Sequence, residues 1–132
     1  MIYIWLNALP ILAATLAGLA VFWTANRLYG RRSGGRATAE FLLLAFLALG
    51  WFAAILAGAL ILAPKAAGAW QMAVGTAVVI WAGFILPVVM VTLRYRGMPI
   101  RRVALDCLTW LMVMLVQAIV LQAIGLLPPP AA

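Results

Sequence analysis

The sequence predicts an all-α membrane protein, a single domain over residues 1–132 in which four transmembrane helices pack as an antiparallel bundle. Its 132 residues are 69% hydrophobic and 8% charged, which leaves too few polar side chains to cover a soluble domain. Four apolar runs can each cross a hydrocarbon core of about 30 Å, which takes about 20 helical residues. Short turns join the last three runs, so these helices should be antiparallel neighbours. The runs are residues 2–28, 39–63, 69–93 and 103–127.

The first run has the length of a membrane helix and lacks the features of a signal peptide. No basic residue precedes it, and it is too long for a signal core. Its arginines, Arg27, Arg31 and Arg32, come at or after its end. We therefore expect the run to be retained as a membrane helix.

The second run begins with residues that favour a helix start. Thr38 is a suitable N-cap, and Glu40 places negative charge near the positive end of the helix dipole. Further along, Gly50, Ala54 and Gly58 recur every four residues and form a smooth stripe on which another helix can pack closely. We expect this stripe to pack within the bundle, and an oligomer contact is the alternative.

The third run carries two glycines and a proline. Gly75 and Gly83 are two four-residue steps apart, so they are further candidates for close helix packing. Pro87 has no backbone N–H, and it should therefore kink the helix and free the carbonyl group of Gly83. The pattern predicts a hinge at Pro87.

The tryptophans divide by their position in the runs. Three lie near run ends, where an indole ring normally lies at the membrane surface: Trp5, Trp23 and Trp70. The other three, Trp51, Trp81 and Trp110, lie well inside their runs. For these we favour core packing or lipid contact, and a groove for a lipid tail, quinone or pigment is the alternative.

The fourth run holds the polar residues that could act inside a membrane: Asp106, Thr109 and Gln117. Only Asp106 can carry a charge, which makes it a candidate ion or proton site. It lies about 5 Å from the predicted helix start, and Arg102 precedes it at the spacing of a helical ion pair. This ion pair and the helix dipole favour the ionised carboxylate, so we expect an entry residue rather than a proton carrier.

Gln117 lies near the middle of the fourth run and needs a hydrogen-bond partner. An unpaired amide in an apolar medium costs several kcal/mol on the more severe scales. We expect an interhelical hydrogen bond, typically worth about 0.6–2 kcal/mol. Gln122, five residues later, points about 140° away, so the sequence does not support a continuous polar path along this helix.

The net charge of +7 is concentrated in the first and third loops. By the positive-inside rule these loops are cytoplasmic, and both termini and the loop around Lys65 face the opposite side. The loop arginines should contact anionic lipid headgroups, and topology explains the charge better than nucleic-acid binding does. The arginines assigned to headgroup contact are Arg31, Arg32, Arg36, Arg94, Arg96 and Arg101.

The sequence contains no histidine and one cysteine, Cys107. Histidine is the usual ligand for haem, chlorophyll or zinc, so we expect no metal site and no such cofactor. A bound lipid, quinone or carotenoid stays open. Phosphate-loop and nucleophile-elbow motifs are also missing, so we expect no catalytic residue and no enzyme activity.

The second half of the chain carries a W-x-G-F start, a Gly-x-Pro turn with a basic residue, and a last helix with a polar-x-x-Thr-Trp pattern. These motifs are Trp81 to Phe84, then Gly97, Pro99 and Arg101, then Asp106, Thr109 and Trp110. With the run from Leu16 to Gly30, this half resembles the domain of unknown function 1761 family of small bacterial four-helix membrane proteins. The resemblance implies a bacterial inner membrane and no activity. With the first and third loops cytoplasmic by the positive-inside rule, both termini are then expected to be periplasmic. The family more often has an amide at the position of Asp106, which suggests hydrogen bonding at the helix entry.

These features predict a non-enzymatic membrane protein. We expect an accessory or structural subunit of a larger membrane complex, or a homo-oligomer, so that its partners are other membrane subunits or itself. The alternative is a small transporter or channel with a polar site near Asp106, Thr109 and Gln117. Compact four-helix exporters usually carry a buried glutamate in their first helix, and the first run here has no acidic residue.

Overall fold

The computed structural model describes residues 2–29, 38–64 and 68–130, and this part of the chain is helical apart from short connections and the segment 125–130 after the last helix. Four of its helices are long and apolar enough to cross a membrane, which confirms the predicted number of candidate spans. The elements are α1 (Ile2–Leu6), α2 (Ala8–Tyr29), α3 (Ala39–Leu62), α4 (Ala69–Ile80), a π-helical turn η1 (Trp81–Ile85), α5 (Leu86–Tyr95) and α6 (Ile100–Ile124).

Two prolines and a glycine explain where helix boundaries differ from the prediction. The first run is interrupted at Asn7, because Pro10 has no N–H to donate to the carbonyl group one turn earlier. The last helix begins at Ile100, directly after Pro99, and ends where Gly125 adopts a φ of 91°. It therefore runs three residues earlier than residues 103–127. Asp106 lies about 9 Å from its start rather than about 5 Å.

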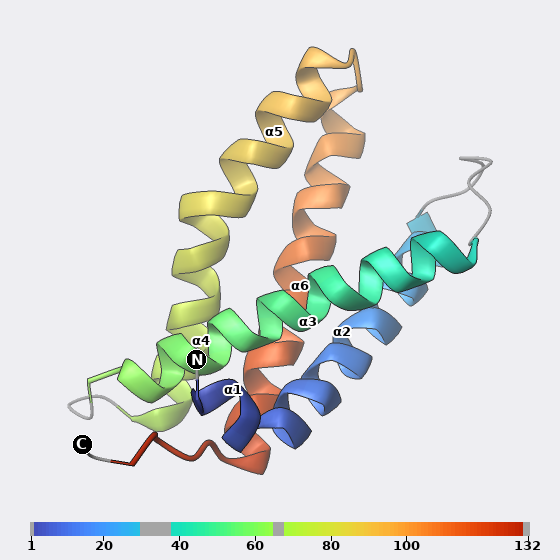
Figure 1. The fold of residues 1–132 in the computed structure, drawn as a ribbon. Coiled ribbons are helices and arrows are strands. Elements are labelled where there is room, and N and C mark those ends of the chain that lie inside the picture. The colour runs from blue at the N-terminus through green and yellow to red at the C-terminus, as the bar shows by residue number, and fades with distance from the viewer. Residues whose placement is uncertain (1, 30–37, 65–67, 131–132) are drawn as a thin grey trace.

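Helix α6 is the central element, since it contacts α2, α3, α4, η1 and α5. In Figure 1, α2 and α3 lean across α6 as one pair, while α4, η1 and α5 run along its other side. The two groups of helices diverge toward the end of the molecule that holds the turn between α5 and α6. Both termini lie at the opposite end.

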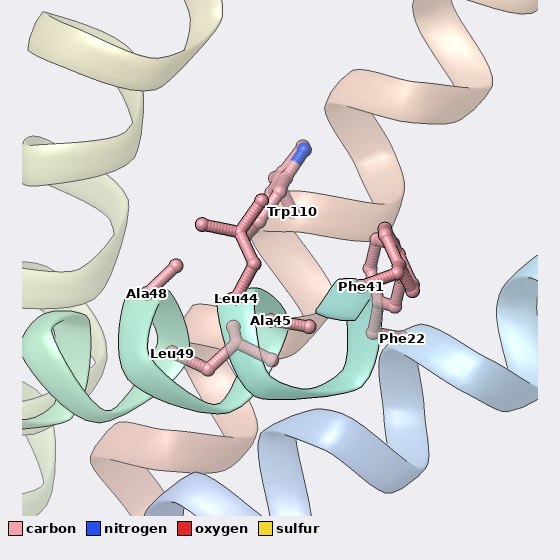
Figure 2. A pocket seen from close by; sticks show the side chains of 7 residues that line it. All are labelled: Phe22, Phe41, Leu44, Ala45, Ala48, Leu49 and Trp110. Atoms are coloured by element: carbon pink, nitrogen blue, oxygen red, sulfur yellow. The ribbon is translucent and has the colours of Figure 1, made fainter. Parts of the chain in front are cut away.

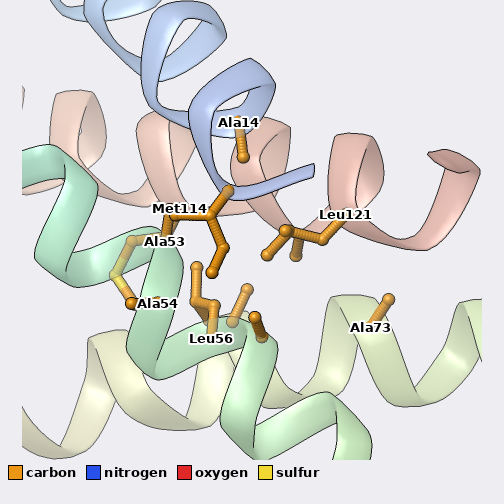
Figure 3. Close-up of a cluster of buried hydrophobic side chains, with 11 residues drawn as sticks. Ala14, Ala53, Ala54, Leu56, Ala73, Met114 and Leu121 are labelled. Atoms are coloured by element: carbon orange, nitrogen blue, oxygen red, sulfur yellow. The ribbon is translucent and has the colours of Figure 1, made fainter. Parts of the chain in front are cut away.

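The core lies where these helices converge (Figure 3). Small side chains from three helices let α6 approach closely, while the bulkier buried side chains come mainly from α3 and α6. The labelled core residues are Ala14 of α2, Ala53, Ala54 and Leu56 of α3, Ala73 of α4, and Met114 and Leu121 of α6. The core is thus built around α6.

The turn η1 is the main irregularity within a span. The backbone N–H of Leu86 donates to the carbonyl group of Trp81, five residues earlier, instead of four. Pro87 follows directly in the first turn of α5. The sequence predicted an irregularity at Pro87 but not the wider turn that precedes it. Whether Pro87 acts as a hinge stays a prediction.

Candidate functional site

The most deeply buried polar side chain among the described residues is Gln117 of α6, which is fully buried. Its Nε2 donates a hydrogen bond of 3.0 Å to the backbone carbonyl oxygen of Leu49 in α3. A helical carbonyl oxygen has a second lone pair, so it can accept this bond in addition to its own helix bond. The prediction that Gln117 needs an interhelical partner is confirmed.

Helix α2 packs closely on α6 at Gly18 and on α3 at Thr15. A Cβ atom at Gly18 would lie 2.8 Å from Gln117 Nε2, closer than real Cβ contacts come. A Cβ at Gly50 would lie 3.6 Å from the hydroxyl oxygen of buried Thr15. That hydroxyl donates to the carbonyl group of Ile11 at 2.7 Å. We call Thr15, Gly18, Leu49, Gly50 and Gln117 the helix crossing.

One atom of the helix crossing lacks a partner. Gln117 Oε1 is buried and accepts no hydrogen bond from the described residues. An unsatisfied buried acceptor costs about 1–3 kcal/mol. The amide is therefore anchored on its nitrogen side and free on its oxygen side, where it can accept a bond from a hydroxyl or amide donor.

The other two polar candidates of α6 do not join this crossing. The Thr109 hydroxyl donates to the carbonyl group of Leu105 in its own helix, at 2.9 Å. Asp106 is half-buried and lies eleven residues before Gln117, about 16 Å along the axis. The fully buried Val113 lies between them. The three residues thus form separate local environments, and the Arg102–Asp106 ion pair stays a prediction.

The glycine stripes had different outcomes. The stripe on α3 packs within the chain, since Gly50 faces Thr15, Ala54 is buried, and a Cβ at Gly58 would lie 3.0 Å from the Tyr3 hydroxyl. Gly75 and Gly83 meet nothing within 4 Å. They lie on a side of the third span (Ala69–Tyr95) that no described helix covers, so their predicted role in helix packing stays a prediction.

Two polar contacts were not predicted from the sequence. The Asn7 amide donates to the carbonyl group of Leu127 at 2.9 Å, and its Oδ1 accepts the Leu127 N–H at 2.7 Å. The Trp81 indole N–H donates to the carbonyl group of Cys107 at 2.9 Å. An amide three residues before Pro10 was the available signal for Asn7, because asparagine favours the residues that precede a helix. Nothing in the sequence identifies the acceptor for Trp81.

Three of the six arginines assigned to headgroup contact belong to the described residues. Arg31, Arg32 and Arg36 fall outside the described residues. Arg94, Arg96 and Arg101 are exposed at the ends of α5 and α6, and Arg94 donates to the carbonyl group of Met98 at 2.8 Å. Their predicted contact with headgroups stays a prediction. No group of three metal-binding side chains occurs among the residues described.

An apolar pocket lies between α2, α3 and α6, with a volume of about 170 Å³ (Figure 2). Its lining side chains are hydrophobic or aromatic: Phe22, Phe41, Leu44, Ala45, Ala48, Leu49 and Trp110. The ring centroid of Trp110 lies 5.7 Å from that of Phe22 and 5.8 Å from that of Phe52. Of the three tryptophans within the runs, Trp110 lines a pocket, Trp81 bonds to α6, and Trp51 is 58% exposed.

Comparison of the chain with protein-family models, with curated proteins and with solved structures finds no match. The candidate sites are therefore defined by their geometry: the helix crossing with its free Gln117 oxygen, the apolar pocket, and the exposed third span.

Proposed function

We propose that this protein is a non-enzymatic subunit of a membrane assembly, either a homo-oligomer or an accessory component of a larger complex. It spans a bacterial inner membrane as an antiparallel four-helix bundle, with the first and third loops cytoplasmic. Four apolar helices and the clustering of arginines in those loops support this placement. The resemblance to the domain of unknown function 1761 family is part of the proposal.

The exposed third span carries the proposal. Of the 18 residues in its apolar stretch, only 6% are buried within the chain, against 22–33% in the matching stretches of the other three spans. Gly75 and Gly83 lie on it with open space beside them. Small residues let helix backbones approach closely in a membrane, where packing rather than the hydrophobic effect drives association. This span is therefore the surface on which another membrane helix can pack.

The test is the mass of the intact assembly after gentle extraction from the native membrane. We expect a complex larger than one chain, either with a second protein or with further copies of this chain. Replacing both glycines, Gly75→Ile with Gly83→Ile, should reduce it to the single chain. The control Ala20→Ile adds a side chain of the same size at an exposed position on α2 and should leave the assembly intact.

A single chain without partners in the wild-type extract would contradict the proposal. Proton flux in liposomes that depends on an added substrate and is lost in Asp106→Asn would favour the transporter alternative instead. The buried Val113 between Asp106 and Gln117 supports the subunit role over that alternative.

A further inference from the structure

The apolar pocket between α2, α3 and α6 has the size and lining of a hydrocarbon site. An apolar cavity of about 150 Å³ stays dry and admits a molecule the size of benzene, and this pocket measures about 170 Å³. It is too small for a helix, whose diameter with side chains is about 10 Å. A segment of an alkyl chain fits it.

The pocket is open to its surroundings. Two of its walls, Phe41 and Leu44, are 40% and 65% exposed, although both line the cavity. The aromatic rings of Phe22 and Phe41 lie 6.4 Å apart, and the walls from α2 and α3 face Trp110 of α6 (Figure 2). A flexible chain can therefore enter from the side without unfolding the helices.

Positive charge lies beyond the pocket on both flanking helices. Arg27 is five residues past Phe22 on α2, about 8 Å along the axis, and Arg102 is eight residues before Trp110 on α6, about 12 Å. Both arginines are exposed, and the Arg27 guanidinium lies over the Trp23 ring, 5.3 Å from its centroid. Two acidic residues lie closer to the lining, Glu40 beside Phe41 and Asp106 one turn before Trp110, while Arg101 adds positive charge next to Arg102. The end beyond the pocket is therefore cationic.

We propose that the pocket binds one acyl chain of an anionic phospholipid whose phosphate lies between Arg27 and Arg102. An apolar cavity with cations about 10 Å beyond it matches an amphiphile with a negative headgroup. It matches a neutral isoprenoid less well, because such a molecule gains nothing from the arginines. The inference rests on the membrane placement and is independent of the subunit role.

The test uses the purified full chain, stripped of lipid in detergent and then titrated with phosphatidylglycerol or phosphatidylcholine of identical acyl chains. Native mass spectrometry counts bound lipids. We expect one tightly bound phosphatidylglycerol, with about tenfold weaker binding of phosphatidylcholine. The reason is that each basic residue near an anionic lipid headgroup strengthens its binding. The double variant Arg27→Gln with Arg102→Gln should lose this preference while still binding both lipids.

Filling the pocket tests the acyl-chain part. Ala48→Trp should abolish binding of both lipids, and Ala48→Leu should weaken it while causing less strain if the larger variant does not fold. The control Ala20→Trp enlarges an exposed residue that does not line the pocket. Equal lipid binding by Ala48→Leu and Ala20→Trp would overturn the proposal, as would a neutral quinone that displaces the phospholipid. The subunit role is tested separately by the mass of the extracted assembly, so lipid binding can fail while the subunit role holds.

Discussion

The helix crossing and the third span use the same small residues in opposite ways. At the crossing, Gly18 leaves no room even for a Cβ atom, because the Gln117 amide occupies that space. On the third span, Gly75 and Gly83 have nothing within 4 Å. Spacing alone therefore does not say which glycines pack within a chain. The polar side chain distinguishes the two regions, since the buried Gln117 amide finds its partner where α3 and α6 meet closely.

The hydrogen bond from Gln117 fixes the register of α3 against α6 and adds little to the net stability of the protein. The bond from Gln117 to Leu49 should contribute about 0.6–2 kcal/mol, and the unpaired Oε1 costs about 1–3 kcal/mol. These contributions nearly cancel. What remains is geometric, because the amide reaches a carbonyl group of α3 at one register of α3 against α6.

The largest expected effect comes from changing Gln117 itself. Gln117→Ala should lower the free energy of unfolding by about 2–3 kcal/mol, because it leaves a cavity in addition to removing the bond. Gln117→Leu keeps the volume and removes the unpaired oxygen, so it should lie within about 1 kcal/mol of the wild type. Unfolding of the purified protein by increasing SDS in mixed micelles measures both. A Leu variant as unstable as the Ala variant would show that the hydrogen bond outweighs packing.

Gly18→Val should be the next most severe change. The added side chain displaces the Gln117 amide and overpacks the crossing, which typically costs about 1–3 kcal/mol. Gly75→Val is the matched control. In the single chain, dissociated from the proposed assembly, it should change stability by less than about 0.5 kcal/mol because its surroundings within the chain are open. The same SDS titration applies. Similar losses in the two variants would remove the contrast between the crossing and the third span.

Asn7 offers a smaller effect at the end of the molecule that holds the termini. Asn7→Ala removes both hydrogen bonds to Leu127, and the loss should be about 1–2 kcal/mol. Because these bonds hold only the segment after α6, the effect should be local. Hydrogen exchange of the Leu127 amide should accelerate while exchange at Gln117 stays unchanged. Faster exchange at both positions would mean that the tail and the crossing unfold together.

The residues that could be predicted from sequence are those whose partners are local. Thr38 caps α3 as expected, with its hydroxyl accepting the Phe41 N–H at 3.2 Å, because both groups lie within one turn. For Gln117, the need for a partner followed from chemistry, but the choice of Leu49 did not, because backbone carbonyl groups are identical in a sequence. The exposure of Gly75 and Gly83 within this chain could not be predicted for a related reason. The spacing marks a smooth face, and only the arrangement of helices decides whether anything covers it.

Trp81 provides the smallest and most specific test, because it bonds the third span to α6. Trp81→Phe keeps an aromatic ring and removes the indole N–H, so it should lower the free energy of unfolding by about 0.5–1.5 kcal/mol. Trp51→Phe is the control, since Trp51 is 58% exposed and should contribute little. Hydrogen exchange along α4 and α5 should increase in Trp81→Phe while exchange around the crossing stays slow. If both regions instead exchange faster together, the third span is not an independent unit and the contrast between the two regions fails. If only α4 and α5 respond, the third span opens as a unit separate from the crossing, as expected for a helix whose remaining surface packs against a partner.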